Sequence, residues 1–506
     1  MTNYMIAEDE HDYIQSYENA TAELSTSPSD QNLQHKAVLS LARAGSLGFA
    51  LSEYKRYALN NVRQHEDIMA LGGRLSKDLY LRSSGKKALD YARDSAHQYE
   101  AAFQDTKGYY SGVNAATMAL MSKMPLATIT DRAKAILNIL PKPENLTTED
   151  HYFIEATRAE CHLLMGDISQ AQACLDAAII FDPLNYTAHA TTLKQFKMIL
   201  AKRDESTEWL SKFNPPKAMH FAGHINLALS QSEQADLKLS IIDTIQKNDI
   251  GFGYGSLAAG SDILIAEALL GEGGQLHIIL PCNIHDFLEY SVKPFGSQWV
   301  ERFETCLANA CSLKIATPNA PWPHPKINQL VGQFAMGKAI LQEHQFSVPS
   351  CQLLIWDQKP KTSYTAVHAA DWNRTGKDQI LIPLKSSNPS MTTPEVIKPN
   401  YSFVLKRSDE TRLKHFKTAA DAMETAKTLR AEKPELSLGL HIDIDGSPSE
   451  TELNKILENS PPQCTLMTEI FASVLGYQQP KNLNMSFAGS IKIDKDTCIR
   501  CYSANL

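Results

Sequence analysis

One stretch of the sequence combines glycines and small polar residues in a pattern that suits phosphate binding. It runs from Gly253 to Glu267 (GYGSLAAGSDILIAE) and predicts a strand end, a loop and the start of a helix. Such a loop leaves backbone N–H groups free at a helix N-terminus, where the helix dipole favours an anion. Gly253, Gly255 and Gly260 would let the main chain approach a ligand without interference from Cβ atoms. We therefore expect a small-molecule site here.

Four polar residues of this stretch are candidate ligand contacts. Ser256 and Ser261 carry hydroxyls, and Ser261 could either cap the following helix or meet a phosphate oxygen. Asp262 lies in the first helical turn, where a carboxylate also interacts well with the helix dipole. Glu267, further along the helix, is a candidate acid or base, or a surface charge. The alternative for the loop is that its glycines only permit close packing of helix and strand.

Two other predicted strand ends add residues to the same site. Gly223 and His224 end the first predicted strand of this region, and Trp356 and Asp357 end the fifth. Open parallel sheets bind ligands at the carboxyl ends of their strands, so these four residues are further candidate contacts. His224 could instead be a hydrogen-bonded histidine at a strand end, without a ligand.

A parallel sheet is needed to bring these residues together, and the chain from 217 to 385 has the pattern of one. The predicted strands cover 218–223, 250–254, 276–280, 313–317, 352–356 and 379–383, and helices are predicted over 235–247, 262–270, 299–310, 330–341 and 365–374. Strands that are apolar throughout and alternate with helices are typical of a parallel sheet covered on both faces.

The chain before this region predicts helix after helix. Between about 30 and 210, apolar residues recur every three or four positions, so each helix has one buried face. Helices separated by the turns at 44–46 and 165–167 form helix–turn–helix units. A break at Asn214-Pro215-Pro216 closes a helical region that we place at 1–213.

The helix–turn–helix unit from Tyr152 to Ala178 resembles a tetratricopeptide repeat. Three segments, 41–45, 109–117 and 155–160, resemble the repeat-containing "TRAF-binding" regulatory region of stress-responsive kinase kinases and bacterial multidomain signalling proteins. This resemblance implies a helical solenoid that docks protein partners. The alternative is a set of helices that only serves as a scaffold.

The segment from 217 to 385 resembles the SLOG superfamily of Rossmann-like nucleotide-binding domains. The resemblance lies in Asp262–Leu269 (DILIAEAL), in Gly273-Gly274 and in the strand that ends at Pro281. It implies a Rossmann-like sheet that binds a nucleotide or a nucleotide-derived signal. The PGGxGT loop with which related cytokinin-activating enzymes hydrolyse an N-glycosidic bond is missing from this sequence. The resemblance therefore favours binding over hydrolysis.

A polar linker at Ser386–Pro394 precedes a third region, 400–506, for which we predict a small α+β domain. It resembles the second half of a class III adenylate/guanylate cyclase homology domain. Active members of that family clamp Mg²⁺ with two aspartates and contact the triphosphate with an Asn and an Arg. Those residues have no counterpart here, and Asp443 and Asp445 are predicted to be turn residues. We expect a degenerate domain without cyclase activity.

The composition is that of an ordinary soluble protein. The chain has 506 residues, 43% of them hydrophobic and 21% charged, with a net charge of −8. This charge predicts no general attraction to nucleic acid or to an anionic membrane, and no apolar run is long enough for a membrane span. Nine scattered cysteines favour reduced thiols and a cytoplasmic location.

Together these observations predict a signalling or sensor protein with a helical docking region, a nucleotide-type ligand site and a degenerate cyclase-like domain. The alternatives are a nucleotide or dinucleotide hydrolase, with Glu267 or Asp357 as acid or base, and a pure interaction scaffold. We expect a protein partner on the helical repeats and no bound metal. The ligand expected is a nucleotide or a nucleotide-derived molecule, and for the assembly a homo-oligomer is kept as an alternative to a monomer.

Overall fold

A computed structural model describes residues 12–142, 148–225, 227, 229–317, 325–359, 363–384, 401–444, 449–481, 485–493 and 497–504. Their contacts define two compact units, Asp12–Pro215 and Pro216–Ala504. The predicted linker Ser386–Pro394 and the predicted turn residue Asp445 lie outside the described residues. Asp443, also predicted to be a turn residue, instead lies in a strand, Leu438–Ile444, where it pairs with Ser402. Among the described helices, none has both the length and the apolar character that crossing a lipid bilayer requires.

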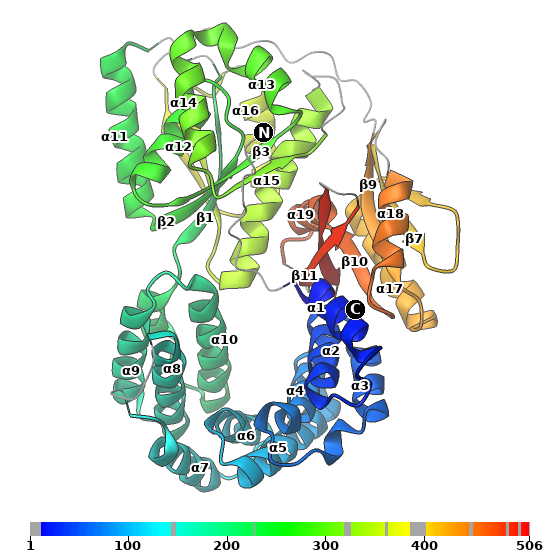
Figure 1. Cartoon of the computed structure of the whole chain (residues 1–506). Coiled ribbons are helices and arrows are strands. Elements are labelled where there is room, and N and C mark those ends of the chain that lie inside the picture. Colours follow the sequence, from blue (N-terminus) through cyan, green and yellow to red (C-terminus); the bar gives the residue numbers. More distant parts are fainter. Residues whose placement is uncertain are drawn as a thin grey trace. The chain divides into compact units, whose positions relative to one another are not determined.

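The first unit is a series of helices that pack as antiparallel neighbours (Figure 1). Its helices are α1 Tyr13–Leu24, α2 Gln31–Arg43, α3 Leu47–Arg56, α4 Glu66–Leu81, α5 Gly85–Thr106, α6 Tyr109–Met121, α7 Leu126–Ile139, α8 Thr148–Met165, α9 Ile168–Phe181 and α10 Tyr186–Arg203, with 3₁₀ turns η1 Leu59–Asn61 and η3 Glu208–Phe213. Side chains of Asp30, Asp167 and Asn185 accept hydrogen bonds from the first backbone N–H groups of α2, α9 and α10. These caps explain where the helices begin.

Each even-numbered helix from α2 to α8 contacts the next even-numbered helix along the unit, and each also packs on its odd-numbered partner. This is the arrangement of a helical-hairpin solenoid, in which neighbouring hairpins bury a continuous core. In the middle of the unit, α6 is buried along most of its length, because α4, α5, α7, α8 and α10 all contact it.

The second unit contains two six-stranded sheets. The central sheet consists of β1 Lys217–Gly223, β2 Ile250–Gly255, β3 Gln275–Leu280, β4 Ser312–Ile315, β5 Cys351–Trp356 and β6 Gln379–Pro383. Its order is β4-β3-β2-β1-β5-β6 and every neighbouring pair is parallel. The predicted strands match these six within a few residues, because strands buried on both faces are marked by short, continuous apolar runs.

Helices connect the strands of the central sheet: α11 Gln231–Lys247, α12 Ser261–Gly271, α13 Ile284–Ser291, α14 Ser297–Ala308, α15 Pro325–Phe346 and α16 Tyr364–Asn373, with the 3₁₀ turn η4 Lys293–Phe295. Both α12 and α15 pack against β1, β2 and β3, with α11 and α14 flanking α12 and α16 flanking α15 (Figure 1). Between 330 and 342 every side chain of α15 is buried. A helix that is buried all round needs cover on both sides.

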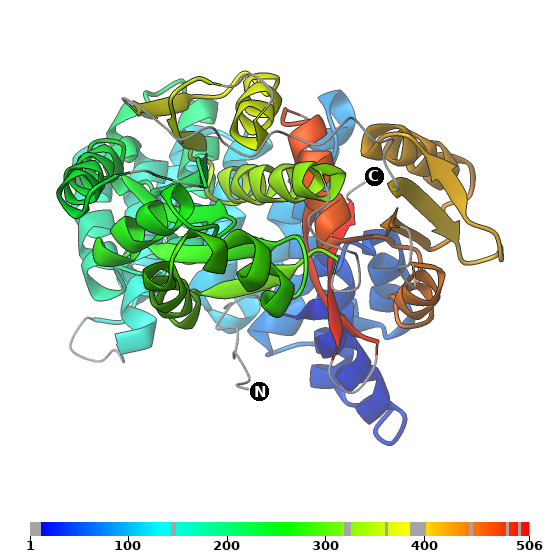
Figure 2. The same cartoon turned by 90° about the horizontal axis from the view of Figure 1, so that it is seen from above.

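That cover comes from the second sheet and its helices. The strands are β7 Tyr401–Arg407, β8 Lys414–Phe416, β9 Leu438–Ile444, β10 Thr465–Thr468, β11 Met485–Lys492 and β12 Cys498–Ala504, and the helices are α17 Ala419–Glu432, α18 Ser449–Glu458 and α19 Glu469–Gln478. The sheet order is β11-β12-β10-β9-β7-β8, with β9 and β10 parallel and the other pairs antiparallel. Helix α19 packs against α15 (Figure 2), and Leu330 and Leu341 of α15 belong to the apolar core of the second sheet. The division of the chain into three domains stays a prediction.

Candidate ligand-binding site

The central sheet reverses its direction of growth between β1 and β5. From β1 the chain adds β2, β3 and β4 on one side, and it then returns to place β5 and β6 on the other. Loops that leave two such neighbouring strands run in opposite directions, and the crevice between them is the usual ligand site of an open parallel sheet. Gly223 ends β1, His224 follows β1 and Asp357 follows β5, so the reversal brings these predicted residues together.

Gly223 permits a close contact between the end of β1 and the start of α12. A Cβ atom at Gly223 would lie 2.2 Å from the Ser261 Cβ and 2.6 Å from its Oγ. The Ser261 N–H donates to the His224 carbonyl oxygen (3.1 Å), and the His224 N–H donates to the Ile355 carbonyl oxygen (3.2 Å). These bonds fix the N-terminus of α12 beside the ends of β1 and β5.

Gly260 precedes α12 in a conformation that other residues rarely adopt, with φ of 103°. A Cβ atom at Gly260 would lie 2.8 Å from the Ile225 carbonyl oxygen and 2.9 Å from that of His224. The other loop glycine, Gly255, lies against the Phe221 ring at the end of β2. Ser256, which follows it, is half-buried. The loop glycines therefore serve two purposes, because Gly260 sets the backbone path and Gly255 makes room in the core.

His224 and Asp357 form a hydrogen-bonded pair across the reversal point. The His224 Nε2 and the Asp357 Oδ1 are 2.8 Å apart, and the His224 side chain is only 3% exposed. The Lys359 N–H donates to the same Asp357 oxygen (2.8 Å). The pair joins residues that are 133 positions apart in sequence, and a histidine–carboxylate pair at the end of a sheet could position a ligand or move a proton.

A second helix N-terminus lies at the same edge of the sheet. Ser363 caps α16 by accepting the Ala366 N–H (3.1 Å), and the Thr365 hydroxyl donates to the Gly223 carbonyl oxygen (3.1 Å). The N-termini of α12 and α16 are thus both tied to Gly223. Their dipoles add, and the combined potential favours an anion. Ser363 is absent from the predicted contacts, although a serine immediately before a helix is a recognisable N-cap.

Two polar groups of the predicted site lack a hydrogen-bond partner within the described part of the chain: the Ser261 hydroxyl and the Trp356 indole Nε1. Both atoms are buried, and leaving a buried donor unsatisfied costs about 1–3 kcal/mol.

Asp262 is a buried carboxyl whose charge depends on pH near neutrality. Burial raises its pKa to about 7, although hydrogen bonds from the Ala258 and Gly223 N–H groups act in the opposite direction. The distance from the Ala258 nitrogen to the Asp262 Oδ2 is 3.2 Å. Below pH 7 the group is mostly neutral, which suits an anion at the neighbouring helix N-terminus.

We therefore expect the affinity for an anionic ligand to fall as pH rises from 6 to 8. Asp262 ionises over this range. If the anion binds only when Asp262 is neutral, a pKa of about 7 lowers the affinity by up to about tenfold between pH 6 and pH 8. In Asp262→Asn the decrease should disappear. Calorimetric titration at pH 6 and pH 8 checks this with a ligand whose phosphates do not titrate there, such as NAD. Equal pH dependence in both proteins would assign the effect to another group.

Unlike the other predicted contacts, Glu267 is bound by basic side chains of two neighbouring helices. Its carboxylate forms a two-pronged ion pair with Arg302 of α14 (2.6 and 2.8 Å) and a longer one with Lys238 of α11 (3.3 Å). Burial alone would raise the pKa of Glu267, but the bonds from Arg302 and Lys238 lower it. In this structure Glu267 ties α11, α12 and α14 together.

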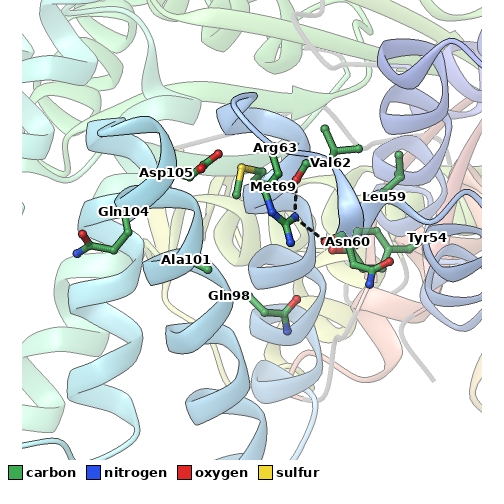
Figure 3. A pocket seen from close by; sticks show the side chains of 10 residues that line it. All are labelled: Tyr54, Leu59, Asn60, Val62, Arg63, Met69, Gln98, Ala101, Gln104 and Asp105. Carbon is green, nitrogen blue, oxygen red and sulfur yellow. Dashed lines mark hydrogen bonds between the residues drawn. The ribbon is translucent and has the colours of Figure 1, made fainter.

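A shallow pocket of about 400 Å³ lies in the helical unit and is lined by residues of that unit alone (Figure 3). Its lining comes from α3, α4, α5 and the connection that contains η1: Tyr54, Leu59, Asn60, Val62, Arg63, Met69, Gln98, Ala101, Gln104 and Asp105. The Arg63 guanidinium donates to the Asn60 and Val62 carbonyl oxygens, and the Asp105 carboxylate accepts from the Gln64 N–H. These charged groups are therefore already engaged in holding the connection in place.

The even-numbered helices of the helical unit also share a polar network. The Lys77 ammonium of α4 donates to the Asn114 Oδ1 of α6 (3.0 Å) and the Gln195 Oε1 of α10 (3.2 Å). The Glu160 carboxylate of α8 accepts from Gln195 (3.0 Å) and from the Thr117 hydroxyl (2.5 Å). We did not predict this network, because Lys77 and Gln195 are 118 residues apart and no local pattern connects them.

Among the described residues, no group of three or more His, Cys, Asp and Glu side chains is placed to hold a metal ion. At the sheet edge the structure places two helix N-termini, a histidine–aspartate pair, a titratable buried carboxyl and two unsatisfied polar groups.

Comparison with known proteins bears on the helical unit. The family model described as "TPR-S: Tetratricopeptide Repeats-Sensor" matches residues 9–119, less than a quarter of the chain. No curated protein sequence matches the chain. Among solved structures, a thermophilic TPR protein from Thermus thermophilus is 14% identical with a TM-score of 0.30, and covers 37% of this chain and 91% of its own.

A tetratricopeptide repeat protein from Parabacteroides merdae is 12% identical with a TM-score of 0.26, and covers 51% of this chain and 91% of its own. A Thermobaculum terrenum O-GlcNAc transferase mutant is 9% identical with a TM-score of 0.18, covering 63% of this chain and 75% of its own. The family match and the hairpin packing agree on one point: the N-terminal helical region of this chain is tetratricopeptide-like.

Proposed function

We propose that this protein is a sensor that binds a nucleotide-type ligand at the reversal point of the central sheet and docks a protein partner through its helical repeats. In this proposal the central region is a SLOG-like, Rossmann-like domain. The C-terminal region is a degenerate cyclase-like domain without catalysis. The protein would act in the cytoplasm, by binding rather than by turnover.

The convergence of two helix N-termini on Gly223 supports a phosphate-bearing ligand best. Ser261 begins α12 and Thr365 lies in the first turn of α16, and both contact the backbone at the end of β1. Aligned N–H groups and dipoles attract phosphate oxygens. A phosphate oxygen would also offer an acceptor to the unsatisfied Ser261 hydroxyl. The near-neutral pKa of Asp262 keeps local negative charge low.

Thermal unfolding in the presence of nucleotides tests this proposal. A ligand at 100 times its dissociation constant should stabilise the protein by about 2.7 kcal/mol. Gly260→Trp should abolish the shift, because the side chain would meet the His224 and Ile225 carbonyl oxygens. Gly271→Trp is the matched control, since Gly271 faces open space at the other end of α12.

Because Gly260→Trp could also unfold the unit, Asp357→Asn provides a second, milder variant at the site. It keeps the shape of the side chain but removes the charge that faces His224. No shift with nucleoside mono-, di- and triphosphates, NAD or cyclic dinucleotides in the unaltered protein would refute the ligand proposal.

The His224–Asp357 pair favours one second candidate function, hydrolysis of a nucleotide or dinucleotide. A carboxylate 2.8 Å from an imidazole could act as general base towards a water molecule. The pair replaces Glu267 as the candidate for this chemistry, because Glu267 is held by Arg302. Chromatography after incubation with NAD, ATP and nucleoside monophosphates tests for hydrolysis. An absence of product would refute the hydrolase function and leave the sensor function as the proposal.

The docking part of the proposal rests on the tetratricopeptide-like packing of the helical unit. If the chain were a scaffold alone, Gly260→Trp would leave its set of bound partners unchanged, in the presence and in the absence of the nucleotide. A sensor predicts instead that the nucleotide changes partner binding by the unaltered protein and not by Gly260→Trp. Affinity capture with both proteins, with and without nucleotide, separates the two.

A further inference from the structure

Helix α16 links the candidate ligand site to the C-terminal part of the chain. At its N-terminus, the Thr365 hydroxyl bonds the Gly223 carbonyl oxygen at the end of β1. At its other end, Asp371 and Trp372 are almost fully buried, at 1% and 0% exposure. The Trp372 ring packs with Met336 and Ile340 of α15 and with Tyr477 of α19.

Asp371 is the point at which three helices meet. Its carboxylate accepts from the Gln329 and Gln333 amides of α15 (3.1 and 3.2 Å) and pairs with Arg374 (2.6 Å). The Tyr477 hydroxyl of α19 faces Asp371 and Arg374, and both groups influence its pKa, which burial raises to about 12. The Asp371 carboxylate therefore ties α15 to α16 beside Tyr477 of α19.

Helices α15 and α19 touch backbone to backbone at Gly337. A Cβ atom at Gly337 would lie 1.9 Å from the Ser473 carbonyl oxygen, so no side chain separates the two helices there. One residue further along, the Lys338 ammonium pairs with the buried Glu469 carboxylate (2.7 Å). Leu330 and Leu341 of α15 belong to the same apolar core as the strands β7, β9 and β10. Closely packed interiors of this kind transmit displacements instead of absorbing them.

We propose that occupancy of the ligand site is transmitted through α16 and α15 to α19, so that the C-terminal sheet is the regulated output of the site. The ligand in this statement rests on the proposed function, whereas the route rests on the contacts of Thr365, Asp371 and Tyr477. A phosphate at the N-terminus of α16 would bind the backbone of the first helical turn, which is the turn that the Thr365 hydroxyl ties to β1. Any resulting shift of α16 moves Asp371, and Tyr477 and α19 must follow.

Hydrogen exchange of the full chain tests the route without a ligand. Thr365→Val removes the hydroxyl that bonds Gly223 and keeps the volume of the side chain. Transmission predicts faster exchange of the α19 amides, 469–478, by about 2- to 30-fold, the usual range for coupled sites. Thr244→Val is the matched control, because its hydroxyl makes a similar backbone bond on the exposed side of α11. It should leave exchange in α19 unchanged.

Two results would overturn the proposal. If exchange in α19 is the same in Thr365→Val as in the unaltered protein, the contact between Thr365 and Gly223 is not coupled to α19. Equal acceleration at all amides from 216 to 504, including those of α11, would show global destabilisation and no route. A double variant, Thr365→Val with Tyr477→Phe, tests the branch of the route at the Tyr477 hydroxyl: the effect of Thr365→Val on exchange in α19 should be smaller in the Tyr477→Phe background than in the unaltered one.

The same measurement with NAD and with ADP as probes distinguishes failure of this proposal from failure of the proposed function. Protection at 217–225 and 469–478 together supports both. Protection confined to the central sheet supports the ligand site and refutes transmission. If neither NAD nor ADP protects any segment, binding of these two nucleotides is refuted. The Thr365→Val comparison, which needs no ligand, still tests whether α16 is coupled to α19.

Discussion

Replacing Glu469 with alanine is expected to lower the free energy of unfolding of the unit Pro216–Ala504 by about 3–5 kcal/mol. Glu469 is buried in the first turn of α19 and pairs with Lys338 of α15, Lys314 of β4 and Arg500 of β12. Removal of the one carboxylate leaves these ammonium and guanidinium groups close together in a buried place. Chemical denaturation followed by circular dichroism measures the loss.

The control for this variant is Glu424→Ala on the exposed face of α17. Glu424 pairs with Lys427, but its side chain is 62% exposed, and such pairs contribute at most about 1 kcal/mol. A loss for Glu469→Ala no larger than that for Glu424→Ala would show that α15 and α19 are not held by this carboxylate.

Acid should reproduce part of the Glu469→Ala effect. Burial alone would raise the pKa of Glu469, but Lys338, Lys314 and Arg500 outweigh it and hold the pKa well below its usual range. The contribution to stability is therefore present above the pKa of an unfolded-chain glutamate, about 4.3, and is lost as pH falls below it. The difference in unfolding free energy between the unaltered protein and Glu469→Ala should shrink steadily below pH 4.

The second large effect is expected at Gly337 in the middle of α15. Gly337→Ala would place a methyl group 1.9 Å from the Ser473 carbonyl oxygen, and backbone cannot give way as a flexible side chain can. The helices must separate, and overpacking of a tight core costs about 1–3 kcal/mol or more. We expect the thermal midpoint of the unit to fall, and the Lys338–Glu469 pair to loosen with it.

Gly271→Ala is the comparison for Gly337→Ala, since a Cβ atom at Gly271 meets nothing within 4 Å. It should be neutral or slightly stabilising, because alanine loses less backbone entropy than glycine in a helix. An equally small effect of Gly337→Ala in calorimetry would mean that α15 and α19 are further apart than the structure places them.

The strands and helices of the central sheet could be predicted from sequence because the signal for them is local. Residues 276–280 are an apolar run of strand length broken only by His277, and 330–341 are mostly apolar over a helical length, with Gln333 and Lys338 as the polar side chains. Both segments adopt the predicted structure, as β3 and within α15. Local periodicity and composition are read directly from the chain, and no partner segment is needed to recognise them.

The candidate site could be predicted in part for the same reason. His224 and Asp357 each follow a recognisable strand, and the rule that ligands lie at the carboxyl ends of parallel strands places both at one edge. Their hydrogen bond was beyond prediction, because it depends on β1 and β5 being neighbours. Sequence order alone allows several other strand orders.

The sequence by itself determined the type and extent of most elements and the tetratricopeptide-like character of the helical region. It also determined that a glycine-containing loop, with Gly255 and Gly260, joins a strand to the helix that follows. Only the tertiary structure decided which distant groups meet. It pairs Glu267 with Arg302, Lys77 with Gln195 and Lys338 with Glu469. The physical reason is that helix and strand formation follow from near neighbours in the chain, whereas buried charges and hydrogen bonds are satisfied by whichever groups the packing brings within about 3 Å.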